Sequence, residues 1–103
     1  MTIGVCRVGD SFSGTCNNHS SATHFTGTWS GMSHLATADG QSVVLVGDVS
    51  PASCGHTAKA VGGASVTSVS GIAVHRSGDS ITIVEGSHGS GSSTSGSSVV
   101  SAA

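Results

Sequence analysis

A short phrase ending in Gly-Asp occurs three times along this chain. The copies read Arg-Val-Gly-Asp at residues 7–10, Leu-Val-Gly-Asp at residues 45–48 and Arg-Ser-Gly-Asp at residues 76–79. Each copy ends a segment rich in β-branched residues and precedes a segment that contains Cys or His. Because a short repeat cannot bury its apolar face alone, the copies are expected to pack against one another around a common axis. The repeat therefore predicts a pseudo-threefold fold.

The composition of the chain favours an ordered, all-β domain. A length of 103 residues predicts a single domain, over residues 1–103. The chain contains 16 Gly, two Phe, one Trp and no Tyr. So few large side chains make only a modest core, and the apolar residues are mostly Val, Ala and Ile, which favour strands. Low aromatic content is also typical of disorder, but disordered chains carry high net charge, whereas this chain has a formal net charge of −2.

The charge pattern excludes several classes of partner. Three basic residues cannot neutralise a track of phosphates, so nucleic acid binding is not expected. No apolar run approaches the roughly 18 residues of a membrane-spanning helix. No basic and then apolar leader follows Met1, so we expect synthesis in a bacterial cytoplasm. Three Cys residues cannot all pair within the chain, and Cys near His favours metal binding.

Alternation and β-branched content predict short strands and no helix of any length. Strands are expected over residues 2–8, 25–29, 33–38, 41–46, 64–69, 72–76 and 79–84. Hairpin turns are expected at Asp39-Gly40 and Ser70-Gly71, and loops over residues 11–21, 49–59 and 85–91. The first loop carries an insertion, because the first interval between Gly-Asp copies is longer than the second. Residues 92–103 have the Gly- and Ser-rich composition of a linker. They lie, however, at the position in the repeat where the earlier copies are expected to form a strand, so we predict a strand.

The loops after the three Gly-Asp copies carry a recurring set of metal-type side chains. They contain Cys16 and His19, then Cys54 and His56, then His88. Zn(II) takes thiolate sulfur and imidazole nitrogen, usually four in a tetrahedron. The loops therefore offer five candidate ligands for four positions. A set of one His from each loop and one Cys would match the threefold repeat. The alternative is that the His residues are solvated and the Cys residues are small buried groups.

The remaining polar candidates have simpler interpretations. Cys6 lies in the first expected strand and is assigned to the core. His24 and His34 lie beside strands and are expected to be ordinary surface or half-buried residues, whereas His75 is a weaker candidate ligand. The three Asp residues of the Gly-Asp copies are expected to cap turns through the backbone N–H groups nearby. Glu85 is the only Glu and lies in the third loop.

These phrases together resemble the PAAR-repeat proteins, the pointed tips of phage tail spikes and type VI secretion spikes. The resemblance is carried by the Gly-Asp copies, by residues 71–79, by Cys54-Gly55-His56 and by Ser87-His88-Gly89. The chain departs from the family in lacking its Pro-Ala-Ala-Arg phrase. Val5-Cys6-Arg7 and Val74-His75-Arg76 stand near its place, and Val44-Leu45 has no Arg.

The resemblance implies a small pseudo-threefold β-cone or prism of short strands and hairpins whose loops are tied by metal. One structural zinc near the apex would be held by three His and one Cys. Transferred to this chain, the ligands are His19, His56 and His88 with Cys16, or with Cys54 as the alternative thiolate. Cys16 makes the better chelate with His19, whereas Cys54 belongs to the better-matching motif, so both remain open.

The implied function is a non-enzymatic tip that caps and sharpens a trimeric, membrane-piercing β-helical spike. The partner would be a VgrG-like secretion spike or a phage hub spike, with one monomeric tip per trimer and transient contact with a bacterial outer membrane. The tip would belong to a virion baseplate or to a bacterial secretion apparatus, and the small size of the chain favours a phage. Two alternatives are a zinc-dependent hydrolytic enzyme with Glu85 as its base, and a metal-free repetitive β adhesin or fibre fragment.

Overall fold

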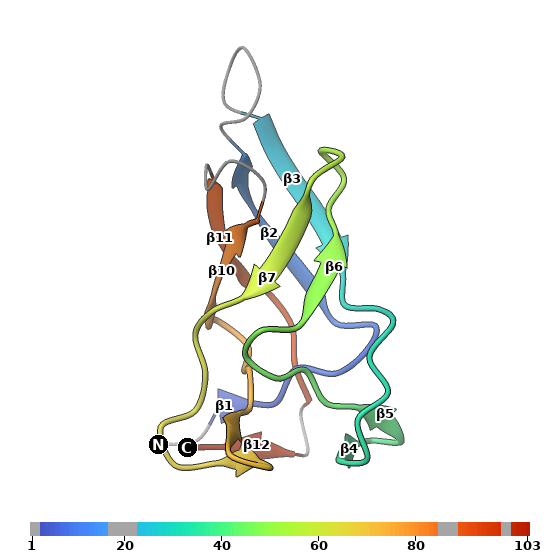
Figure 1. Cartoon of the computed structure of the whole chain (residues 1–103), viewed down its shortest axis with the longest axis vertical. Coiled ribbons are helices and arrows are strands. Elements are labelled where there is room, and N and C mark those ends of the chain that lie inside the picture. The colour runs from blue at the N-terminus through green and yellow to red at the C-terminus, as the bar shows by residue number, and fades with distance from the viewer. Residues whose placement is uncertain (1–2, 17–22, 85–88, 98–99) are drawn as a thin grey trace.

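The computed structural model describes residues 3–16, 23–84, 89–97 and 100–103, and within them the protein is all-β. The molecule is elongated, with extents of 40 × 23 × 23 Å. Hairpins point toward one end of the long axis, and short two-stranded ribbons form the other end, which we call the base (Figure 1). The described residues include no helix that is long and apolar enough to cross a membrane.

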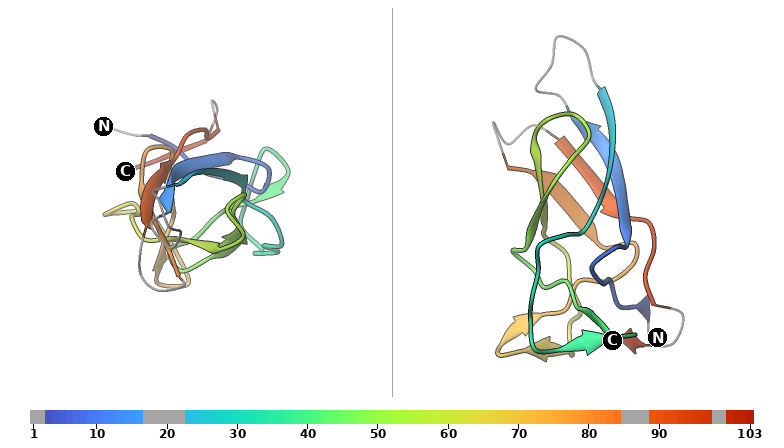
Figure 2. Two further views of the ribbon diagram at one scale, coloured as in Figure 1. Left: turned by 90° about the horizontal axis from the view of Figure 1, so that it is seen from above. Right: turned by 90° about the vertical axis from the view of Figure 1, so that its right-hand side faces the viewer.

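Three antiparallel hairpins, one after each Gly-Asp copy, form the body above the base. Their strands are β2 (Ser11–Cys16) and β3 (Thr23–Thr28), β6 (Val49–Pro51) and β7 (Thr57–Ala60), and β10 (Ser80–Ile83) and β11 (Gly89–Ser93). The hairpins join into one antiparallel sheet in the order β3-β2-β11-β10-β7-β6. Viewed along the long axis, this sheet curls around the core (Figure 2).

Serine side chains join the two edge strands of the curled sheet, β3 and β6. The backbone N–H of Thr26 donates to Ser53 Oγ at 2.9 Å, and the Ser53 N–H donates to the Thr26 carbonyl at 2.8 Å. Nearer the base, the Ser30 N–H donates to Ser50 Oγ at 2.9 Å, and the Ser50 hydroxyl donates back to the Ser30 carbonyl at 3.2 Å. These bonds replace a regular ladder and hold the first and second hairpins together.

The base consists of three two-stranded ribbons, one per copy. The ribbons are β4 (Thr37–Ala38) with β5 (Gln41–Ser42), β8 (Ser68–Val69) with β9 (Ile72–Ala73), and β1 (Ile3–Gly4) with β12 (Ser101–Ala102). The first two are the predicted hairpins, and both central residues of each turn have positive φ, with values of 52° and 81° at Asp39-Gly40 and 52° and 82° at Ser70-Gly71. In the third ribbon the two ends of the chain pair with each other.

The segments that precede the three Gly-Asp copies meet at the centre of the molecule. Their middle residues form a closed ring of backbone hydrogen bonds, in which Cys6 N–H donates to His75 O at 3.0 Å, Val44 N–H to Cys6 O at 3.0 Å and His75 N–H to Val44 O at 2.8 Å. Isolated bridges on either side of the ring repeat the same relation, pairing Arg7 with Val43, Leu45 with Val74, and Arg76 with Val5. This ring marks the predicted pseudo-threefold axis.

Each Gly-Asp copy turns the chain away from this ring in the same way. The Asp carboxylate accepts the backbone N–H three residues earlier, from Arg7 to Asp10 at 2.8 Å, from Leu45 to Asp48 at 2.8 Å and from Arg76 to Asp79 at 2.9 Å. The glycine before each Asp has a positive φ of 99°, 98° and 86° in chain order, a conformation that favours glycine. The prediction that these Asp residues cap turns is confirmed.

A small aromatic cluster fills the body of the molecule. The Trp29 ring lies 4.8 Å from that of Phe12 and 5.4 Å from that of His75, measured between ring centroids, and Phe12 also contacts Phe25. All four side chains are buried. A second apolar cluster lies under the ring at the base and contains Val5, Ala38, Val43, Leu45, Ala64, Val74 and Ala102.

A chain of hydrogen bonds fixes the tautomer of the buried His75 ring. Trp29 Nε1–H donates to Ser93 Oγ at 2.9 Å, and the same oxygen lies 2.8 Å from His75 Nε2. His75 Nδ1 lies 2.7 Å from the Gly62 carbonyl, which can only accept, so Nδ1 carries a proton. Burial lowers the pKa of His75 and so favours the neutral ring, in which Nε2 accepts from the Ser93 hydroxyl. His75 is therefore a core residue, and its alternative role as a metal ligand is excluded.

Several boundaries of the predicted strands and loops are wrong. Four segments that were expected in loops belong to strands: residues 11–16 to β2, 49–51 to β6, 57–59 to β7 and 89–91 to β11. These strands are rich in Gly, Ser and Thr and lack a clear apolar alternation. Glycine instead allows close pairing: a Cβ on Gly14 would overlap the Ser90 carbonyl, and one on Gly91 would overlap the Ser13 carbonyl. Of residues 92–103, parts lie in β11 and β12, and residues 98–99 lie outside the described residues.

The turn caps differ in the number of hydrogen bonds they accept, and this difference predicts a ranking. Asp10 also accepts from the Arg7 guanidinium and the Ser95 hydroxyl, whereas His34 is the only other donor to Asp48 among the described residues. Asp10→Ala should therefore lower the free energy of unfolding by about 3 kcal/mol and Asp48→Ala by about 1 kcal/mol. The loss is larger for Asp10→Ala because that substitution leaves more hydrogen-bond donors unpaired than Asp48→Ala does. Urea unfolding followed by Trp29 fluorescence measures both, and equal losses would contradict the ranking.

The neutral His75 ring predicts that stability falls with acidification. Burial lowers the pKa of His75 below its ordinary value of 6.5, despite the opposing bond to Gly62. Below about pH 6.5 the unfolded chain takes up a proton that the folded chain excludes, so the free energy of unfolding falls.

His75→Asn, which keeps an amide donor for Gly62 and cannot titrate, should flatten this decline, while His24→Asn on the exposed face of β3 should leave it unchanged. Urea midpoints between about pH 7 and about pH 5, measured with a chelator present, test the difference. An equally steep decline in the His75 variant would overturn the assignment.

Candidate metal centre

Two thiols and one imidazole come together at the end of the molecule opposite the base. Cys16 ends β2, and Cys54 and His56 lie in the turn between β6 and β7. The sulfur atoms of Cys16 and Cys54 and a ring nitrogen of His56 all lie within 4.8 Å of one another, and Cys16 Sγ lies 3.6 Å from His56 Nδ1. Cys16 is fully buried, while Cys54 and His56 are half-buried. Such a cluster could hold a metal ion.

The turn that carries Cys54 and His56 is fixed by its own backbone bonds. The Ala52 N–H donates to the His56 carbonyl at 2.9 Å, and the Gly55 N–H donates to the Ala52 carbonyl at 3.1 Å. Gly55 has a φ of 86°, which reverses the chain between the two candidate ligands. The bonds between Ser53 and Thr26 also anchor this turn to β3. The spacing Cys-Gly-His therefore places both ligand atoms on one side of a rigid turn.

Close packing between neighbouring strands positions Cys16. Cys16 pairs with Thr23 on β3 and with Gly89 on β11. Gly89 has a φ of 148°, and a Cβ there would come within 2.7 Å of the Ile83 side chain and 2.8 Å of the Thr15 carbonyl. Only glycine lets β11 approach β2 this closely, so Gly89 contributes to the fixed position of the Cys16 sulfur.

Burial and neighbouring groups set the ionisation of the Cys54 thiol. Burial raises the pKa of the Cys54 thiol, the backbone N–H of His56 lowers it by bonding to the sulfur, and the neighbouring Cys16 raises it. The Cys54 thiol therefore resists ionisation, whereas a bound divalent cation would reverse this tendency and draw off its proton. The N–H bond to the Cys54 sulfur would then stabilise the thiolate as an outer partner of the metal. The donor set of two sulfurs and one nitrogen suits a thiophilic metal rather than magnesium or calcium.

The cluster differs from the predicted ligand set in one respect. Cys16 and His56 were predicted together, and Cys54 was an alternative to Cys16, but the fold brings both thiols to the same site. His19 and His88, the other two predicted ligands, lie outside the described residues, as does Glu85.

The other candidates lie elsewhere in the fold. Cys6 is buried at the central ring, its thiol donates to the Ser95 carbonyl at 3.4 Å, and burial raises its pKa to about 12, so it is a core residue as predicted. His24 is exposed on β3. His34 Nε2 bonds Asp48 Oδ2 at 2.8 Å, an interaction that was not predicted. The sequence contained one signal for this interaction. Leu45 stands where the other two copies have an arginine, so Asp48 lacks the arginine partner of Asp10 and Asp79 and is left to bind another donor.

Comparisons of the chain with protein-family models, with curated proteins and with solved structures gave no match.

The geometry predicts that both thiols contribute to metal binding. The wild-type protein should bind one Co(II) ion with a strong sulfur-to-metal charge-transfer band. Cys16→Ser and Cys54→Ser should each bind roughly a hundredfold more weakly, since one of about four ligands is lost. Each should also keep only about half of the band, since one of the two thiolates remains. Cys6→Ser, which alters a buried thiol outside the cluster, should leave both readouts unchanged. Wild-type affinity in the Cys54 variant would remove Cys54 from the ligand set.

Proposed function

We propose that this protein is the tip of a trimeric, membrane-piercing β-helical spike, in a phage tail or a type VI secretion system. The observation that carries the proposal is the closed ring formed by Cys6, Val44 and His75, which gives a single chain pseudo-threefold symmetry. A single chain with this symmetry can present an equivalent surface to each subunit of a trimer. The motifs that resemble PAAR-repeat proteins agree with this role.

The base offers a surface suited to a threefold partner. Three ribbons lie at this end of the molecule, each with strands of only two residues (Figure 2). Short strands at the edge of a molecule can pair with the strands of a partner. The spike would then be capped by one tip per trimer.

Exposed apolar residues recur around the base. Leu35 is fully exposed two residues before β4, and Val66 is 79% exposed two residues before β8. The corresponding position before β12 is Val99, which lies outside the described residues. Ile72 and Val100 are also exposed near these ribbons. Repeated apolar side chains on a small surface favour a site that a protein partner covers.

At the opposite end, we propose that the metal is one structural zinc ion. Cys16, Cys54 and His56 would supply three ligands, and His19 or His88 would complete a tetrahedron. The ion would tie together hairpin loops that a small core stabilises only weakly, because metal binding adds directly to folding free energy. With four protein ligands the zinc keeps no open position for water, so we assign no catalytic residue.

The proposal places the protein in a virion baseplate or a secretion apparatus of a bacterium. It is a monomer by itself, binds no nucleic acid, and contacts an outer membrane only transiently when the spike passes through.

Co-expression with a trimeric β-helical spike protein from the same genome tests this function. The double variant Leu35→Asp, Val66→Asp should fold normally, because both side chains are exposed, yet bind the spike about a hundredfold more weakly, because it buries two unpaired charges. Val84→Asp, at an exposed position beside the end of β10 and away from the base, is the matched control and should bind normally.

Affinity is measured on purified proteins by biolayer interferometry with immobilised spike. A stable free monomer without spike affinity would reject the function, and equal binding by the double variant would reject the base as the interface.

A further inference from the structure

The second Gly-Asp copy lacks the arginine that accompanies the other two. In the first copy the Arg7 guanidinium binds both carboxylate oxygens of Asp10, with Nε at 3.0 Å and an Nη at 3.1 Å. In the third copy Arg76 binds Asp79 in the same two-point manner, at 2.9 and 3.1 Å. The fold therefore contains two internal examples of what occupies this position beside the Asp turn.

In the second copy the corresponding residue is Leu45, whose side chain is buried in the base cluster. Asp48 Oδ2 accepts the Leu45 N–H and His34 Nε2, both at 2.8 Å. Asp48 Oδ1 accepts no hydrogen bond from the part of the chain that the structure describes. The Asp48 side chain is 20% exposed, against 7% for Asp10 and 13% for Asp79. One carboxylate oxygen thus lacks the donor that its two counterparts have.

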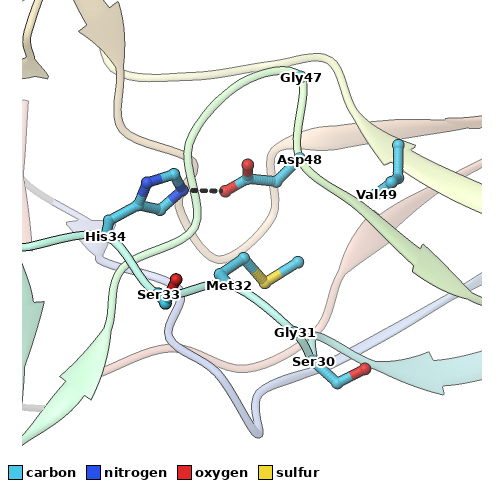
Figure 3. A pocket seen from close by; sticks show the side chains of 8 residues that line it. All are labelled: Ser30, Gly31, Met32, Ser33, His34, Gly47, Asp48 and Val49. Atoms are coloured by element: carbon cyan, nitrogen blue, oxygen red, sulfur yellow. Dashed lines mark hydrogen bonds and ion pairs between the residues drawn. The ribbon is translucent and has the colours of Figure 1, made fainter.

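A surface hollow of about 440 Å³ lies beside this carboxylate. It is lined by Ser30, Gly31, Met32, Ser33, His34, Gly47, Asp48 and Val49. Figure 3 places the Met32 side chain and the His34–Asp48 pair on its wall. Neither Lys nor Arg lines the hollow, whereas Asp48 and His34 both do.

We propose that this hollow, which we call the Asp48 pocket, binds the guanidinium group of an arginine side chain from a protein partner. The incoming guanidinium would donate to the free Oδ1 of Asp48, as Arg7 and Arg76 do in the other copies. The Met32 side chain gives an apolar wall for the methylene stem of the arginine. Arginine is preferred over lysine because its guanidinium is planar, delocalised and more weakly hydrated than an ammonium group, so it loses less hydration on entering an ion pair at an interface.

The surroundings of the pocket favour a protein partner over a free small cation. Leu35, directly after His34, is fully exposed, so an apolar contact lies next to the charged one. An apolar residue beside an arginine site is typical of the centre of a protein interface. The proposal does not depend on the metal centre or on the proposed function, because it rests on the comparison between the three copies.

The direct test is a titration with N-acetyl-arginine methylamide, followed by NMR signals of the His34 ring and the Met32 methyl group. We expect saturable shifts with a dissociation constant in the millimolar range, at least fivefold weaker binding of N-acetyl-lysine methylamide, and no saturable response to the citrulline analogue, which has the shape of arginine without its charge. No shift with the arginine probe, or an equal response to citrulline, would overturn the proposal.

Two variants locate the binding. Asp48→Asn keeps an oxygen to accept the Leu45 N–H but removes the charge, and should weaken arginine binding at least tenfold. Leu45→Arg supplies the missing guanidinium from the chain itself, as in the other copies, and should also prevent binding. Asp39→Asn makes the same charge change at the base and should bind as the wild type does.

Trp29 fluorescence reports whether each variant folds. If neither pocket variant folds, the comparison of arginine with citrulline on the wild-type protein decides. A folded Leu45→Arg protein that still binds the probe at wild-type affinity would place the binding elsewhere and reject the pocket.

Discussion

The ring of three backbone hydrogen bonds between Cys6, Val44 and His75 organises the whole molecule. Each bond links a different pair of copies, so no copy can complete its pairing alone. The Gly-Asp turn that follows each ring segment sends the chain outward into a hairpin, and the hairpin returns it to a ribbon at the base. The cluster of Cys16, Cys54 and His56 at one end and the three ribbons of the base at the other both depend on this common centre.

The copies share one backbone plan but have diverged in their side chains, and the divergence is compensated locally. At the ring, the three equivalent positions hold cysteine, valine and histidine. The buried imidazole is accommodated because Gly62 and Ser93 satisfy its two ring nitrogens, and Trp29 in turn donates to Ser93. At the turns, His34 partly replaces the arginine missing beside Asp48. Pseudo-symmetry in a single chain thus allows each copy to acquire a distinct polar feature while the backbone stays the same.

Features set by a few neighbouring residues could be predicted from the sequence, and features set by pairing across copies could not. The turns at Asp39-Gly40 and at the Gly-Asp copies follow from local backbone chemistry. The strand β2 was missed because Gly14 pairs with β11 by close approach rather than by apolar alternation. The meeting of Cys16 with Cys54 depends on the register between hairpins distant in sequence, so the sequence left the two thiols as alternatives.

Native mass spectrometry of the protein co-expressed with a trimeric β-helical spike protein tests the proposed function most directly, because it counts chains and metal ions together. The proposal predicts a complex of three spike chains, one copy of this chain and one zinc ion, since a single chain would supply both the threefold surface and the metal ligands. Three copies of this chain per spike, or a complex whose mass includes no metal, would contradict it.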